Sequence, residues 1–375
     1  MSLPLKILLV QLYSNGDCLY ATTVARQIKN DFPNCKLTWG IASYCKSIIA
    51  NNNYVDEIME VNTIAKNDIV AFRKFKKQLN QFKEQGIFDE IFITHNMDTN
   101  LALYDGSIRS GIFRAYPNPI TVPVQPVLNL YDDEIKNAAT FAEKHQLQNY
   151  DHVILFEYAP QSRQIKISDN FSISIAEKLT SNPDTAVILS SGNKITHPNK
   201  NIIDGSVLTL RETAALTHYC SILLGCTSGI TWISTSNAAK QLPMIQLINP
   251  DAIWLNSVSN DFKKFGLDDS GVIEITDMVE NIIVRCINEA MINFTDARKK
   301  YNKQIPLHFR ATRDIVYNLL CYLEFKAIAK HIKINREVYG NDLSFYKEIF
   351  LGFITAPFKL IKNIFLKKIL KRYEY

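Results

Sequence analysis

Two short loops hold the side chains whose types and spacing suit group-transfer chemistry. The first is Ser14-Asn15-Gly16-Asp17, which follows an aliphatic run and opens a helical pattern. The second is Thr227-Ser228-Gly229, which follows Ile222-Leu223-Leu224 in the same way. A glycine permits a tight turn and close backbone approach, and the N–H groups of a helix start attract anions. The two loops therefore predict a carboxylate at one place and an anion-binding turn at another.

Each loop also has a purely structural explanation. Aspartate is a preferred helix N-cap, so Asp17 could serve only to accept backbone hydrogen bonds. It could equally serve as a catalytic carboxylate at the mouth of a cleft. Likewise, Thr227 and Ser228 could cap a helix or, with nearby N–H groups, hold a diphosphate. The first loop lacks the Gly-x-Gly-x-x-Gly pattern, which disfavours a dinucleotide oxidoreductase.

Aliphatic runs alternate with helical patterns through the first part of the chain. Strands are expected at 6–10, 36–40, 57–61 and 90–94, with helices at 18–30, 43–51 and 69–84 between them. This alternation predicts a parallel sheet with right-handed crossovers and helices on both faces. Because ligands bind at the carboxyl ends of such strands, residues 14–17 are expected at a cleft.

A second alternating series follows a proline-rich segment at 116–127 and a helix at 132–145. We therefore expect two doubly wound Rossmann-like domains, residues 1–148 and 149–335. Strands are expected at 152–156, 186–190, 201–204, 222–224 and 244–248, and helices at 170–180, 210–220, 230–239, 278–293 and 311–330.

Composition narrows the class of protein. A chain of 375 residues, 47% hydrophobic and 21% charged, fits a globular protein of about two domains. Its net charge of +5 is too small to indicate nucleic-acid binding. Seven scattered cysteines without a Cys-x-x-Cys pair indicate free thiols in a reducing cytoplasm. We find no cleavable signal pattern and no apolar run near the roughly 18–20 residues of a membrane-spanning helix.

The order of these landmarks resembles glycosyltransferase family 9, the lipopolysaccharide heptosyltransferases, over about residues 5–250. That family has a strand, Ser-x-x-Gly-Asp, a helix, Phe-Pro and Asn-Pro-Tyr-Val-Asp-Glu in this order. In the second domain, Thr227 and Trp232 replace the aspartate and histidine of the family motif Asp-[Ser/Thr]-Gly-x-x-His. The matching segments are Ser14-Asn15-Gly16-Asp17, Ala21-Thr22-Thr23-Val24, Phe32-Pro33, Asn53-Tyr54-Val55-Asp56-Glu57 (Asn53 replacing the proline), Leu210-Arg211-Glu212, Ser228-Gly229 and Pro243.

The resemblance implies a GT-B fold and an inverting, metal-independent glycosyltransferase with no cofactor besides its nucleotide-sugar substrate. Asp17 matches the family's general base. The two substitutions leave the donor sugar open, as heptose or another sugar. Donor contacts are implied at Arg163, Lys166, Thr227, Ser228 and Gly229, and the acceptor side at Ser14, Asn15, Gly16, His95 and Asn96.

The acceptor-side candidates keep plainer alternatives. A lone histidine such as His95 is more often structural than functional. Arg109 and Arg114 could bind acidic groups of an acceptor, although surface salt bridges are the simpler expectation. Two other functions also fit the fold: a nucleotide-sugar epimerase, and a non-catalytic GT-B scaffold at the membrane, which the altered Thr227 and Trp232 would favour.

Residues 343–375 form a basic and apolar tail, with six cations after residue 358 against one acid, Glu374. A basic side chain near an anionic leaflet contributes about 1 kcal/mol. We expect the tail to bind the inner face of the inner membrane, which suits a lipid-linked glycan acceptor. A helix packed on the protein or on a partner is the other interpretation. Deleting the tail is expected to move the protein from membrane to soluble fractions.

Overall fold

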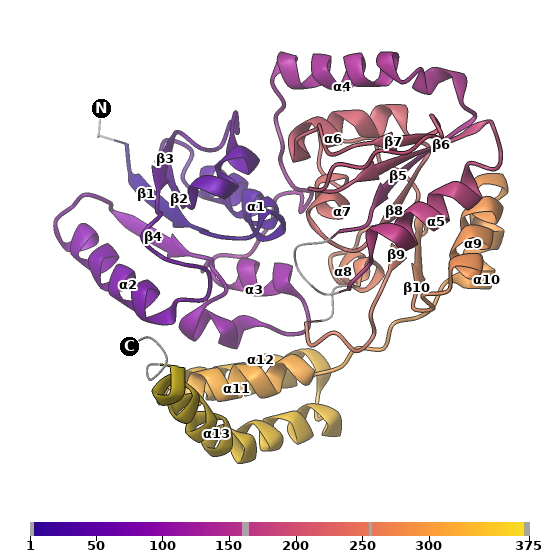
Figure 1. Cartoon of the computed structure of the whole chain (residues 1–375). Coiled ribbons are helices and arrows are strands. Elements are labelled where there is room, and N and C mark those ends of the chain that lie inside the picture. The colour runs from indigo at the N-terminus through magenta and orange to yellow at the C-terminus, as the bar shows by residue number, and fades with distance from the viewer. Residues whose placement is uncertain (1–3, 160–164, 255–256, 371–375) are drawn as a thin grey trace.

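The computed structural model describes residues 4–159, 165–254 and 257–370, with side chains through residue 358. Two parallel sheets form two lobes, and a layer of helices lies beneath the first lobe in the view of Figure 1. The predicted α/β architecture of two Rossmann-like lobes with C-terminal helices is confirmed. All seven cysteines lie in described residues and are free thiols.

The first lobe has a four-stranded sheet in the order β3-β2-β1-β4, with every pair parallel. Ile7 to Val10 of β1 are completely buried, as expected for a central strand covered on both faces. This order places the carboxyl ends of β1 and β4 side by side. The elements are β1 (Lys6–Val10), α1 (Asn15–Asp31), β2 (Lys36–Ile41), η1 (Ser43–Ile49), β3 (Glu57–Glu60), α2 (Ile69–Glu84), β4 (Glu90–Ile93), η2 (Asp98–Leu103) and α3 (Ile108–Arg114), where η marks a 3-10 helix.

The second lobe has a six-stranded parallel sheet in the order β10-β9-β8-β5-β6-β7. Its elements are α4 (Asp132–Lys144), η3 (Leu147–Asn149), β5 (His152–Glu157), α5 (Asp169–Leu179), β6 (Thr185–Ser190), β7 (Ile202–Asp204), α6 (Leu210–Leu216), η4 (Thr217–Tyr219), β8 (Ile222–Gly225), α7 (Gly229–Ile233), β9 (Met244–Leu247), α8 (Val258–Lys264), β10 (Val272–Ile275), α9 (Glu280–Ile292) and α10 (Phe294–Tyr301).

Several elements differ from the sequence prediction, which did not include the helices α3, α8 and α10. Strand β10 was missed because it is short and contains Glu274, a buried acid whose Oε2 accepts a hydrogen bond from Ser257 Oγ at 2.8 Å. The helix expected at 311–330 is two helices, α11 (Arg310–Leu320) and α12 (Phe325–Tyr339), because Leu323 adopts φ 57° and reverses the chain. The helix expected at 230–239 ends early, at Ile233.

Helix α4 lies over the second sheet and packs against α6 (Figure 1). Arg211 Nε contacts Glu134 Oε1 at 2.6 Å, and Asn137 Nδ2 donates to Glu212 Oε1 at 2.7 Å. By its contacts α4 therefore belongs with the second lobe, although it precedes the boundary expected at residues 148 and 149.

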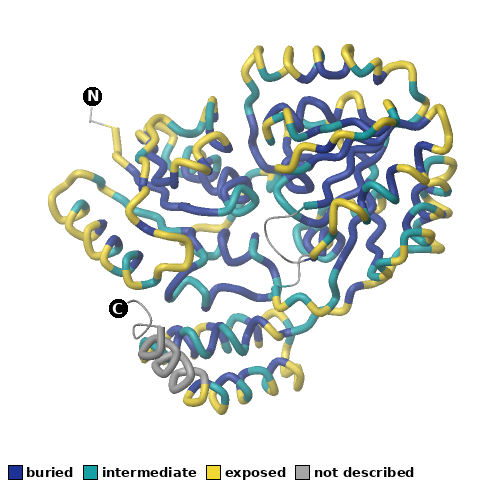
Figure 2. Tube along the Cα trace, viewed as in Figure 1, coloured by how far each residue is buried: buried dark blue, intermediate teal, exposed yellow. Residues whose placement is uncertain are grey.

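The two lobes share one continuous core. A single cluster of buried apolar side chains extends from Leu9 and Trp39 in the first lobe to Leu155 and Ile233 in the second. Figure 2 shows buried segments of α1, α3 and α7 where the lobes meet. The lobes therefore join through a packed interface.

The C-terminal layer attaches to the first lobe. In α12, the ring of His331 lies 3.2 Å from the carbonyl oxygen of Ala102 in η2. Helix α13 (Leu343–Leu370) then packs on α11 so closely that a Cβ atom at Gly352 would lie 2.8 Å from Cβ of Val316. Among the helices that the structure describes, none combines the length and apolar character needed to cross a membrane.

Candidate active site

The two loops singled out in the sequence meet across the lobes. A Cβ atom at Gly16 would lie 3.3 Å from Cδ1 of Trp232, and one at Gly229 would lie 3.9 Å from Cβ of Asn15. The start of α1 thus faces the start of α7, each at the carboxyl end of a central strand. This is the place where parallel α/β sheets bind ligands.

Asp17 lies inside the first turn of α1, whereas Ser14 is the N-cap residue. The N-cap interpretation of Asp17 therefore does not hold. Ser14 has φ 67°, in the left-handed region that only glycine enters without cost. We expected Gly16 to provide the conformational freedom of this turn, but its lack of a side chain instead makes room for Trp232.

The carboxyl of Asp17 lies among packed atoms, although the residue keeps some exposed surface. Burial penalises the charged form and raises the pKa of Asp17 to about 7, while the positive charge of Lys66 acts in the opposite direction. Lys66 lies in the loop after β3 and was not predicted. A carboxyl with a pKa near neutrality can accept and release a proton under physiological conditions.

A buried carboxylate occupies the start of α7. Glu157, the last residue of β5, is 2% exposed, and its two oxygens accept hydrogen bonds from four groups of the second loop. The donors are the Ser228 hydroxyl, the Thr231 hydroxyl at 2.7 Å, the Ile230 N–H at 3.1 Å and the Cys226 N–H at 3.3 Å. The negative charge is thus compensated within the protein.

The Ser228 hydroxyl donates to Glu157, so in this arrangement it is engaged within the protein. Gln246 of β9 supports the same loop, since its Oε1 accepts the Thr227 N–H at 3.0 Å. Gly229 instead faces Asn15. An acid ending a buried strand at its carboxyl edge was the sequence signal that could have identified Glu157.

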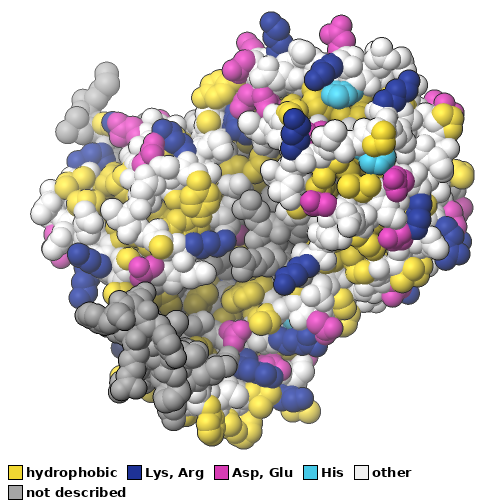
Figure 3. All heavy atoms as spheres, in the orientation of Figure 1, with side chains coloured by type: hydrophobic (Ala, Val, Ile, Leu, Met, Phe, Trp, Pro, Cys, Tyr) yellow, Lys and Arg dark blue, Asp and Glu magenta, His cyan; other side chains and the backbone are white. Residues whose placement is uncertain are grey.

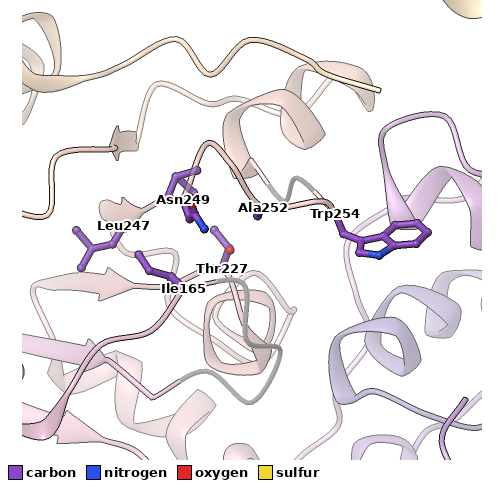
Figure 4. Close-up of a pocket in the computed structure, with 7 residues that line it drawn as sticks. Ile165, Thr227, Leu247, Asn249, Ala252 and Trp254 are labelled. Atoms are coloured by element: carbon purple, nitrogen blue, oxygen red, sulfur yellow. The ribbon is translucent and has the colours of Figure 1, made fainter. Parts of the chain in front are cut away.

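A pocket lies at the carboxyl ends of the second sheet (Figure 4). It measures about 200 Å³, including space open to solvent, and it includes Thr227, one of the predicted donor residues. The indole of Trp254 reaches across to the first lobe, where it meets the Tyr104 ring edge-on at 4.9 Å between centroids. The full lining is Ile165, Thr227, Leu247, Ile248, Asn249, Ala252 and Trp254.

Of the two predicted donor cations, Lys166 lies among the described residues and Arg163 does not. Lys166 is exposed in the segment between β5 and α5. It directly follows Ile165, which lines this pocket. Arg163 lies outside the described residues.

The predicted acceptor-side residues are placed differently from one another. His95 is buried between the rings of Tyr13 and Phe72, with Nδ1 3.2 Å from Gln11 Nε2, and burial lowers its pKa to about 4. These contacts favour packing over acceptor binding. Asn96 is half-buried, and its side-chain amide has no hydrogen-bond partner among the described residues. Asn15 Oδ1 shares this feature.

Both arginines considered for the acceptor are engaged with acids of the protein, and only Arg114 is partly exposed. Arg109 is completely buried between the lobes and pairs with Asp261 at 3.1 Å. Arg114 pairs with the buried carboxylate of Asp105 at 2.6 Å. The expectation of surface salt bridges was also wrong for Arg109, because long-range packing encloses it.

No protein-family profile and no curated protein sequence matches the chain. Solved structures do match. Escherichia coli ADP-heptose LPS heptosyltransferase II aligns with TM-score 0.52 and 11% identity over 77% of this chain and 99% of that one. A glycosyl transferase family 9 protein from Veillonella parvula gives 0.49 and 14% over 84% and 98%. E. coli heptosyltransferase WaaC with ADP gives 0.43 and 12% over 78% and 100%.

A heptosyltransferase is thus among the structural neighbours, in agreement with the sequence resemblance. At 11% identity, the likeness to heptosyltransferase II shows a shared GT-B fold.

Glu157→Ala should destabilise the fold by about 3 kcal/mol or more, because it leaves several buried donors unpaired. Glu157→Gln keeps the shape and one acceptor oxygen, so it should cost about 1 kcal/mol. Urea unfolding measures both, with exposed Glu84→Ala as a control expected within about 0.5 kcal/mol of wild type. Equal stability of Glu157→Ala and the control would contradict the described network.

Proposed function

We propose that the chain is an inverting, metal-independent glycosyltransferase that moves a sugar from a nucleotide-sugar to a lipid-linked surface glycan. The contact between the two loops supports this most directly, since Gly16, the residue before Asp17, lies against Trp232 of the second lobe, and the pKa of Asp17 is raised to about 7. The fold shared with a heptosyltransferase is consistent with the proposal. Lipopolysaccharide is one such acceptor.

In this mechanism, Asp17 is the general base. Its carboxylate takes the proton from an acceptor hydroxyl as that oxygen attacks the anomeric carbon. The bond from the anomeric carbon to the diphosphate breaks at the same time, and its electron pair leaves with the nucleoside diphosphate. Attack opposite the leaving group inverts the anomeric configuration.

The donor would lie on the second lobe, with its nucleoside in the pocket that contains Thr227 and Trp254. Because Glu157 engages the Ser228 hydroxyl, we assign neutralisation of the leaving diphosphate to a cation after β5. Lys166 is the described candidate, and Arg163 is the other. ADP-heptose is the donor named for heptosyltransferase II, but Thr227, Trp232 and Glu157 leave the sugar and nucleotide of this chain to experiment.

Asp17→Asn should lower kcat for sugar transfer by about 10²–10⁴-fold, because it removes the proton acceptor while keeping size and shape. The donor is first identified by thermal shift with ADP-, UDP-, GDP- and CMP-sugars, since a ligand that binds the native state raises its stability. Transfer is then measured with that donor and a lipid-linked glycan. Asp133→Asn, an exposed acid of α4, is the matched control and should keep wild-type rates.

Full activity of Asp17→Asn would contradict the assignment of the base. Turnover of the nucleotide-sugar alone, without any glycan, would favour an epimerase. Failure of every nucleotide-sugar to bind would favour a non-catalytic scaffold, which the Glu157 network makes a specific alternative because it occupies the expected phosphate contact.

We also propose that the C-terminal tail binds an anionic membrane surface. The inner face of α13 packs on α11 through Phe345 and Ile349. Its outer face exposes apolar side chains at helical spacing: Leu343, Phe350, Phe353, Ile354 and Phe358. Figure 3 shows hydrophobic side chains along the lower edge of the molecule, where the helical layer lies. Since this layer is attached to the first lobe, membrane contact would bring lipid-linked acceptors near Asp17.

The double change Phe350→Glu and Phe358→Glu should reduce binding to vesicles with anionic lipid, because it removes exposed apolar contacts of 63% and 71% exposure and adds negative charge. Vesicle co-sedimentation measures the effect. These substitutions spare the packed face, which deletion of 343–375 would remove. Ile292→Glu, an 87% exposed site on α9, is the control and should bind as wild type. Unchanged binding of the double variant would refute the membrane surface.

A further inference from the structure

The interface between the lobes encloses a cation. Arg109 of α3 is completely buried, and its guanidinium lies 4.5 Å from the ring centroid of Tyr20, 5.3 Å from that of Phe265 and 5.7 Å from that of Trp232. All three rings are within cation–π range. Tyr20 belongs to α1 in the first lobe, whereas Trp232 and Phe265 belong to the second.

One acid completes this cluster. Asp261 of α8 places Oδ2 3.1 Å from Arg109, and its Oδ1 accepts a hydrogen bond from Ser107 Oγ at 3.1 Å. Arg109 and Ser107 come from the first lobe and Asp261 from the second. A buried guanidinium is costly to desolvate unless it is paired, so separating the lobes would leave both charges without their partners. The pair therefore holds the lobes in one arrangement.

Trp232 connects this buried pair to the candidate catalytic loop. Its indole is 3% exposed and meets the Tyr20 ring edge-on at 5.0 Å between centroids. Its Cδ1 atom also lies 3.3 Å from the Cβ position at Gly16, the residue before Asp17. The Trp232 side chain of the second lobe thus packs both on the cluster around Arg109 and on the loop that contains Asp17.

We propose that Trp232 is a positioning residue for Asp17, and that the Arg109–Asp261 pair holds its indole in place. The indole sets the loop of residues 15–17 against the second lobe and excludes water from that side of the carboxyl. This inference rests on the proposed role of Asp17 as the base. It also gives a function to the tryptophan that replaces the family's histidine.

The titratable groups around Asp17 come from other residues than Trp232, so the positioning role of Trp232 can be distinguished from an effect of charge. Lys66 faces it from the loop after β3, the thiols of Cys18 and Cys45 from α1 and η1, and the Tyr20 hydroxyl from α1. Trp232 itself has no charge. Replacing it therefore alters the proton affinity of Asp17 through solvation and position alone.

Trp232→Ala should admit water beside Asp17 and shift its titration from about 7 toward the ordinary value of 3.8. The acid limb of the pH–rate profile should move to lower pH, and kcat should fall by about 10²-fold from loss of orientation. Trp232→Phe should restore most of both. The control is Phe82→Ala, which removes a half-buried ring of α2 that packs on Phe88 and belongs to neither the Arg109 cluster nor the contact with Gly16, so the acid limb should stay in place.

A second readout does not need activity. Carbon-13 NMR follows the Asp17 carboxyl of the full chain, assigned by its absence in Asp17→Asn. Unchanged titration in Trp232→Ala, or an equal shift in Phe82→Ala, would overturn the positioning role even if the wild type transfers sugar. Failure of the wild type to transfer sugar would instead contradict the proposed function, and the carboxyl titrations would still decide the role of Trp232.

Discussion

The packing of α1 against α7 is the constraint on which the rest of the structure depends. It brings the starts of two helices from different sheets into contact, with Gly16 facing Trp232 and Gly229 facing Asn15. A side chain at Gly16 would crowd the indole of Trp232, whereas a Cβ atom at Gly229 would make ordinary contacts. The buried Arg109–Asp261 pair stabilises the same contact from behind. Because the sheets supply the strand ends and this interface aligns them, two loops some 210 residues apart form one site.

The two carboxyl groups of this site show how environment divides similar residues between different roles. Glu157 is surrounded by donors that stabilise a fixed negative charge, so it organises the second loop. Among the described residues, no hydrogen bond to the carboxyl of Asp17 comparable to these is found, and burial raises its pKa to about 7. The first group suits a structural anion, whereas the second suits proton transfer.

Local sequence patterns predicted the parts of this architecture that local chemistry determines. Alternating aliphatic runs located nearly all strands of both sheets, and the Ser14–Asp17 loop followed from its place after β1. The remainder depends on partners far away in sequence. Nothing near Arg109 indicates that rings from α1 and α7 enclose it, and nothing near Ser228 indicates a carboxylate from β5. The break at Leu323 within a predicted helix was not foreseen, because a left-handed leucine leaves no compositional signal.

The central claim is that Asp17 acts as the base at the meeting point of the two lobes. The most direct measurement is the pH dependence of kcat/KM for sugar transfer by the wild-type protein, with the donor found by thermal shift. A base must be deprotonated, so the rate should rise with pH and reach half its plateau near pH 7, where Asp17 titrates. A profile that stays flat from pH 8 down to about pH 5 would indicate an ordinary carboxylate or another base, and would contradict this account.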